Sequence, residues 1–295
     1  MMRALTLAVV ASLLPATGFT QAATRRVFVD ATATTGRTVT DLRAEEFEIT
    51  ENGELRDISL AKLGRRPARV VLIVDSTDAI RQPIGTIRKA LAAFVEELDP
   101  QIEMMLVSVA GTPQVRVRPT LERESLVKSV NNIFGTAGSN RMHRIIDDLF
   151  HRFAQTTDYR PIFVVVTAEG FESTENINPQ EIKHLTDHFA ARGGFLHAVR
   201  LLVPGSTSSS GGGAFTELPV SLMIGRATGG AYTNISPAGL LEVLQKLATG
   251  INDSYTSTLN YQIEFTSAQA SGKKPAPPQV RVLREGVELN VIFTP

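Results

Sequence analysis

The chain has 295 residues, of which 43% are hydrophobic and 20% are charged, with 30 basic against 30 acidic side chains. This composition is that of a globular protein with one large domain, or with one domain and a smaller one. The zero formal charge gives no global basic signal for nucleic acid, and the lack of cysteine excludes a disulfide framework and a lipidated cysteine.

Residues 1–22 have the features of a signal peptide. Arg3 is the only charge before the apolar run from Leu5 to Leu14, and the small residues around Ala22 suit a signal peptidase. The run is too short to span a membrane, and no later segment has the ~20 apolar residues required. Cleavage after Ala22 would leave 29 basic against 30 acidic residues. Export without cysteine favours a bacterial periplasmic or secreted protein.

The first part of the mature chain is predicted to be β-structure. Residues 26–33 alternate as in a strand. Asn52-Gly53 lies between the β-prone runs 47–50 and 55–58, and this dipeptide is a strong hairpin signal.

A linker follows at 64–67, with a local cluster of basic side chains. Arg65 and Arg66, beside Arg69, form the densest basic patch of the chain. We interpret this patch as a solvated linker.

From Ala68 the pattern changes to alternating strands and helices. This order predicts a mostly parallel, doubly wound α/β sheet with helices on both faces. The predicted strands are 70–74, 104–110, 114–118 (an edge), 162–167, 195–203 and 231–234. The predicted helices are 80–98, 121–133, 140–154, 179–192, 218–227 and 237–251. The Gly/Ser-rich composition of 205–213 favours a flexible loop.

After about residue 253 the pattern returns to β. Strands are expected at 258–265, 279–284 and 287–293, the last two as a hairpin around Glu285-Gly286.

This order predicts two domains after the signal peptide. Residues 26–63 and 255–293 are expected to form one small β-rich module, a sandwich or sheet. Residues 68–253 would form an α/β domain inserted between its halves.

The run 70–74 is apolar without alternation, which suits a strand buried on both faces of a parallel sheet. It ends in Asp75-Ser76-Thr77-Asp78. Open α/β sheets bind ligands at the carboxyl ends of their strands, so this cluster marks the expected binding edge.

Three segments resemble the von Willebrand factor type A domain, and more narrowly the bacterial VWFA-related proteins. Residues 39–53 look like that family's lead-in segment, 70–75 match its first core strand, and Thr228-Gly229-Gly230 is similar to the turn before its last strand. The likeness runs from about residue 26 to the C-terminus. It implies a Rossmann-like α/β domain that binds proteins.

The resemblance also implies a metal-ion-dependent adhesion site. There, loops reading Asp-x-Ser-x-Ser, Thr and Asp hold Mg²⁺ or another divalent cation, and a partner's carboxylate completes the shell. Here Asp75 supplies the first carboxylate and Thr77 the first hydroxyl. In the second loop Ser139 is the better match, with Thr136 as the alternative.

The chain departs from this pattern at two positions. Ala79 stands where the second Ser belongs, and the third-loop aspartate is replaced by Ala168, or by Glu169 if the register slips by one. The implied metal ligands are therefore Asp75, Thr77, Ser139 and Glu169, a degenerate site. Asp78 and Asn140 are the candidate partner-binding residues. The alternative is that Asp75, Thr77 and Asp78 cap backbone amides at the strand-to-helix turn.

Two histidine pairs on predicted helices have spacings worth testing for metal binding. His184 and His188 lie four residues apart, and His143 and His151 flank Asp147-Asp148. With no third ligand evident in sequence, we interpret them as solvated histidines.

The missing motifs argue against an enzyme. There is no cysteine nucleophile, no Gly-x-Ser-x-Gly elbow, no phosphate-binding loop and no dinucleotide fingerprint. We therefore expect an exported protein-binding or scaffold module that uses the loops 75–79, 135–140 and 168–173. The partner is an unidentified protein. The alternative is a cation-dependent hydrolase or phosphoryl-transfer enzyme that uses Asp75.

Overall fold

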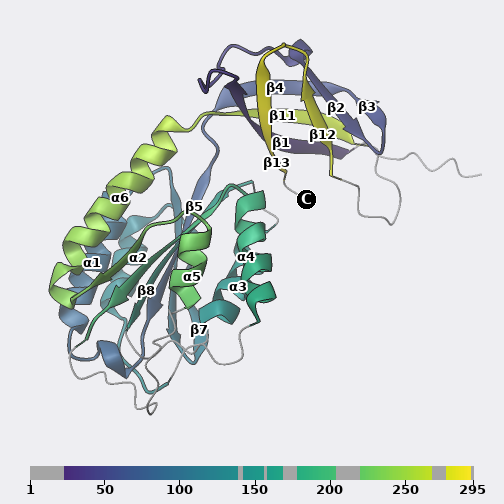
Figure 1. Cartoon of the computed structure of the whole chain (residues 1–295). Coiled ribbons are helices and arrows are strands. Elements are labelled where there is room, and N and C mark those ends of the chain that lie inside the picture. Colours follow the sequence, from purple (N-terminus) through teal and green to yellow (C-terminus); the bar gives the residue numbers. More distant parts are fainter. Residues whose placement is uncertain are drawn as a thin grey trace, which may run out of the picture.

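The computed structural model describes residues 23–138, 142–155, 158–168, 178–203, 220–267 and 277–293. The chain forms an α/β domain and a β-sandwich, joined by two crossings (Figure 1). One crossing is the linker between β4 and β5, and the other leads from the long helix α6 into β11. This arrangement confirms the predicted fold class, while the exact domain boundaries stay a prediction.

A six-stranded sheet forms the centre of the α/β domain. The strand order is β10-β9-β8-β5-β6-β7, with only β7 antiparallel to its neighbour. The strands are β5 (Ala68–Asp75), β6 (Glu103–Ala110), β7 (Thr112–Thr120), β8 (Arg160–Ala168), β9 (Phe195–Leu201) and β10 (Tyr232–Ile235).

Helices cover both faces of this sheet (Figure 1). One face carries α1 (Ile84–Glu97), α2 (Arg123–Asn131) and α6 (Leu240–Ser257), and the other carries α3 (Met142–Phe153), α4 (Pro179–Ala191) and α5 (Val220–Ala227). Two short 3-10 helices, η2 (Asp78–Ile80) and η3 (Pro237–Gly239), precede α1 and α6.

The unbroken apolar run of β5 has the predicted cause. Val70, Leu72 and Val74 pack on the α1 side, whereas Val71 and Ile73 pack on the α3 side. Both sets are fully buried, because successive side chains of a strand point to opposite faces of the sheet.

Two predicted helices have different ends in the structure. The expected helix 80–98 begins at Ile84, because Pro83 occupies the N-cap and the preceding turn is the 3-10 helix η2. The helix expected to end at 251 continues to Ser257, because its apolar period continues through the buried residues Ile251 and Tyr255.

The sandwich consists of two antiparallel sheets around one apolar cluster. The first has the order β13-β1-β11-β4, and the second the order β12-β2-β3. Their strands are β1 (Ala23–Ala33), β2 (Phe47–Glu51), β3 (Glu54–Arg56), β4 (Ile58–Gly64), β11 (Asn260–Ser267), β12 (Gln279–Val282) and β13 (Val287–Phe293), with the 3-10 helix η1 (Ala44–Glu46) before β2.

Residues from both ends of the described chain meet in this core. Val29 of β1 and Ile263 of β11 are fully buried beside Ile49 of β2. The hairpin at Asn52-Gly53 is confirmed. Both residues have positive φ, as the two central residues of a type I′ β-turn require.

The predicted C-terminal hairpin is wrong. β12 pairs with β2, and β13 pairs with β1, so consecutive strands lie in different sheets. The alternating pattern identifies both strands but not their partners. Each strand extends a sheet next to the same core, where Val280 and Leu289 pack against it.

The interpretation of the basic linker as solvated is wrong for Arg66, which is 4% exposed. Its guanidinium donates to the backbone carbonyls of Asp158 (2.9 Å), Tyr159 (3.1 Å) and Arg192 (2.7 Å). It also lies 4.9 Å from the ring centroid of Phe28 in β1. Arg66 therefore connects the sandwich to the α/β domain.

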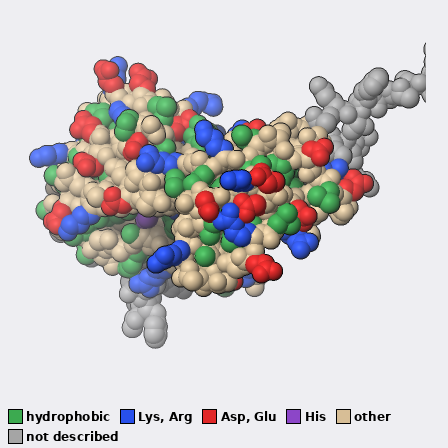
Figure 2. Space-filling model, turned by 90° about the horizontal axis from the view of Figure 1, so that it is seen from above, with side chains coloured by type: hydrophobic (Ala, Val, Ile, Leu, Met, Phe, Trp, Pro, Cys, Tyr) green, Lys and Arg blue, Asp and Glu red, His purple; other side chains and the backbone are tan. Residues whose placement is uncertain are grey.

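Charges of both signs are mixed on the face of the molecule seen in Figure 2. This face, viewed from the sandwich end, shows basic and acidic side chains next to each other. The mixture agrees with the balanced charge of the chain.

Candidate functional site

Asp75 is the last residue of β5, at the carboxyl end of the sheet. β5 begins at the linker to the sandwich, so its carboxyl end lies at the far end of the α/β domain (Figure 1). The Asp75 side chain is buried, with the residue only 1% exposed.

Both carboxylate oxygens of Asp75 accept backbone hydrogen bonds. Oδ1 accepts from the N–H of Thr77 (2.9 Å), and Oδ2 accepts from the N–H of Ala168 at the end of β8 (3.0 Å). The Thr167 hydroxyl is 3.4 Å from Oδ2. The bond from the Thr77 N–H is a cap within the strand-to-helix turn, whereas the bond from the Ala168 N–H joins the ends of two neighbouring strands.

Burial raises the pKa of Asp75 above its ordinary value. The hydrogen bonds from the N–H groups of Ala168 and Thr77 oppose this shift, because they stabilise the charged form.

Thr77 does not follow the capping interpretation. It occupies the N-cap of η2, but its side chain makes no capping bond. Its hydroxyl is near enough to the Asp75 carboxylate to lower the pKa of that group, yet Oγ1 has no correctly oriented hydrogen-bond partner in the described part of the chain.

The segment after α2 packs against the Asp75 turn. The N–H of Thr136 donates to the carbonyl of Ser76 (2.8 Å), and Thr136 forms an isolated parallel β-bridge with Thr77. A Cβ on Gly135 would lie 3.1 Å from the carbonyl oxygen of Thr77. Of the two alternatives for the second loop, Thr136 therefore lies beside the turn, while Ser139 falls outside the described residues.

The edge of this region is more exposed. Asp78 is half-buried and pairs with the exposed Arg81 of the same turn instead of capping amides. Phe134 is 61% exposed, and the Arg88 guanidinium lies 4.5 Å from its ring centroid.

The described residues supply few ligands for a divalent cation. Asp75 already accepts two N–H bonds, Thr77 and Thr136 each offer one hydroxyl, and Ala79 and Ala168 have no oxygen on their side chains. This set does not fit the six oxygens that Mg²⁺ requires. Glu169 and Asn140 lie outside the described residues, so their assignment stays a prediction.

The turn at Thr228-Gly229-Gly230 has the tight packing that its sequence suggests. The Thr228 hydroxyl accepts from the N–H of Leu196 (3.0 Å). A Cβ on Gly230 would lie 1.9 Å from the carbonyl oxygen of Leu196, so only glycine fits there.

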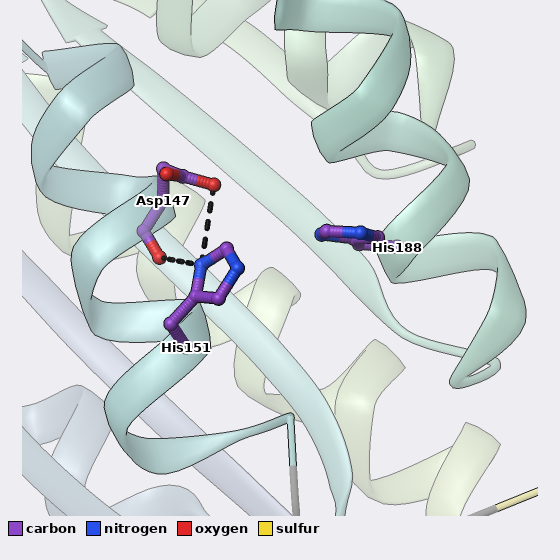
Figure 3. A group of neighbouring side chains, drawn as sticks. All are labelled: Asp147, His151 and His188. Atoms are coloured by element: carbon purple, nitrogen blue, oxygen red, sulfur yellow. Dashed lines mark hydrogen bonds and ion pairs between the residues drawn. The ribbon is translucent and has the colours of Figure 1, made fainter. Parts of the chain in front are cut away.

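A second group of polar side chains lies between α3 and α4 (Figure 3). Asp147, His151 and His188 place their ligand atoms within 4.8 Å of one another. The sequence shows the spacing within each helix but not the contact between helices. A signal was available, because the two helices flank β8 in the chain, and helices on one face of a sheet become neighbours.

Burial, followed by the nearby His184 and His151, lowers the pKa of His188. Its imidazole is therefore neutral at pH 7.

Solved structures share this fold at low sequence identity. A von Willebrand factor type A protein from Catenulispora acidiphila is 11% identical, with a TM-score of 0.50 over 91% of this chain and 73% of that one. That share of this chain is larger than the α/β domain alone, so the likeness extends into the sandwich.

Two further similar structures cover less of this chain. The conserved hypothetical protein BatB from Bacteroides thetaiotaomicron is 15% identical, with a TM-score of 0.47 over 64% of this chain and 100% of that one. The vWF domain of the type V pili tip protein Mfa5 from Porphyromonas gingivalis is 10% identical, with a TM-score of 0.47 over 65% and 97%. No protein-family profile and no curated protein matches the chain. The chain therefore has the fold of a von Willebrand factor type A domain, as the resemblance in its sequence predicts.

Proposed function

We propose that this chain is an exported protein-binding module whose contact surface is the carboxyl end of the α/β sheet. One observation carries this proposal. The ends of β5 and β8 and the segment after α2 converge there through Asp75, Ala168 and Thr136. Loops held by a rigid sheet are the usual position for binding residues.

The exposed edge of this surface has suitable chemistry for a protein partner. Phe134 offers a largely exposed aromatic ring, and Asp78 and Arg81 add charges beside it. Aromatic and arginine side chains contribute much of the binding energy at protein interfaces. Asp78 and Asn140 remain the predicted partner contacts.

The proposed surface works without a cation. Both oxygens of Asp75 hold backbone N–H groups and thereby fix the two strand ends. The alternative hydrolase or phosphoryl-transfer enzyme would need this carboxylate free for chemistry, and these hydrogen bonds disfavour it.

Export rests on the signal-peptide features of residues 1–22, which lie outside the described residues. None of the described helices is long and apolar enough to cross a membrane. We propose a periplasmic or secreted location.

Site-specific photo-cross-linking in cells of the source organism tests the contact surface. A photoreactive phenylalanine at Asp78 or Ala137 should give a discrete cross-linked protein, because both positions lie on the proposed surface. The matched control is Glu96, an exposed residue near the C-terminal end of α1, at the opposite end of the sheet. The same adduct at all three positions, or an adduct only at Glu96, would contradict the proposal.

A further inference from the structure

The cluster between α3 and α4 combines two imidazoles and one carboxylate from two helices. Asp147 and His151 lie one helical turn apart on α3, and His188 points from α4 toward them (Figure 3). The ring nitrogen Nδ1 of His151 is 2.9 Å from the Asp147 carbonyl oxygen and 3.4 Å from its carboxylate Oδ1. These contacts hold the α3 pair together.

His188 is placed by aromatic packing. Its ring stacks on the buried Phe150 ring, with centroids 5.6 Å apart and an interplanar angle of 17°. Its Nδ1 is buried, and within the described residues it has no hydrogen-bond partner. A buried imidazole nitrogen without a partner is unusual, since such groups are generally satisfied.

The separation of the ligand atoms suits a metal after small side-chain rotations. Ligands around a tetrahedral zinc ion lie about 3.4 Å apart, whereas the three atoms here lie within 4.8 Å. Asp147 and His151 have side chains that are 39–48% exposed, so water can replace their mutual contacts when they rotate toward His188. Imidazole and carboxylate together favour zinc over magnesium or calcium.

We propose that Asp147, His151 and His188 form a zinc site that ties α3 to α4. Three protein ligands leave one position of a tetrahedral ion for water. This site lies on the α3 side of the sheet and uses none of the residues around Asp75.

Calorimetric titration of tag-free protein, cleaved after Ala22, with Zn²⁺ tests this proposal. We expect one saturable equivalent with micromolar or tighter affinity, and a higher unfolding temperature in the presence of Zn²⁺. Co²⁺ in place of Zn²⁺ should give the visible absorption of a tetrahedral ion.

Conservative variants identify the ligands. Asp147→Asn and His151→Gln change partly exposed side chains and should lower the affinity for Zn²⁺ by about tenfold or more. His188→Gln should do the same, and far-UV circular dichroism without metal checks that each variant is folded.

His184 is the matched control, because its exposed ring lies 4.0 Å from the His188 ring on the same helix but outside the three-residue cluster. His184→Gln should leave the affinity within about threefold. The proposal is overturned if no saturable equivalent binds, if His151→Gln binds Zn²⁺ as wild type does, or if only His184→Gln and His188→Gln lose binding.

Discussion

Replacing Arg66 by methionine should lower the free energy of unfolding by about 3–5 kcal/mol. The variant removes three hydrogen bonds to the carbonyls of Asp158, Tyr159 and Arg192. Bonds from a charged donor contribute about 1.5–3 kcal/mol each, but burying the guanidinium costs part of that gain. Burial and the neighbouring Arg192 and Arg160 lower the pKa of Arg66 to about 9, so the group is still charged at neutral pH.

Urea unfolding followed by circular dichroism measures this effect. Arg65→Met is the matched control, since Arg65 is exposed in the same linker, and it should change stability by no more than about 0.5 kcal/mol. Because Arg66 connects the sandwich to the α/β domain, its loss should also weaken the cooperativity between them. Equal stability of the two variants would show that Arg66 is not the connection we describe.

Replacing Asp75 by alanine should lower the free energy of unfolding by about 2–4 kcal/mol. The variant leaves the N–H groups of Thr77 and Ala168 without their acceptor at a buried position. The control is Asp78→Ala, which removes a half-exposed carboxylate of the same turn and should cost less than about 1 kcal/mol. A loss no greater for Asp75→Ala than for Asp78→Ala would contradict the structural role of the carboxylate.

The difference in stability between wild type and Asp75→Ala should depend on pH, and its direction follows from the pKa of Asp75. Burial raises the pKa of Asp75 in the folded state above 3.8, so the folded state keeps the proton to a higher pH than the unfolded state does. Stability from this group is therefore present at low pH and is lost as pH rises from about 3.8 through the raised pKa. The gap between wild type and Asp75→Ala should thus be smaller at pH 7 than at pH 4.

Much of the fold could be predicted because its signals are local. The apolar run of β5 and the turn at Asn52-Gly53 each define one element within a few residues. The partner of a strand is not a local property. For that reason the sequence identifies β12 and β13 as strands but does not show that they pair with β2 and β1.

The site shows the same division between local and distant information. The position of Asp75 at a strand end follows from the sequence, but its bond to the Ala168 N–H depends on the register between β5 and β8. The sequence shows that Arg66 carries a charge. The carbonyls that accept its hydrogen bonds, however, come from segments about 90 and 126 residues later in the chain. The contact of His188 with His151 likewise needs two helices to be packed together.

The central claim is that the Asp75 carboxylate holds the carboxyl-end loops together and that this surface needs no cation. Thermal unfolding in chelator, and then in millimolar Mg²⁺ or Ca²⁺, tests it most directly, beside the Asp75→Ala variant. These two ions prefer oxygen ligands, so the histidine cluster does not interfere. We predict equal unfolding temperatures with and without the ions. A cation-dependent rise in wild type that vanishes in Asp75→Ala would contradict the claim, because a ligand of the folded state must stabilise it by mass action.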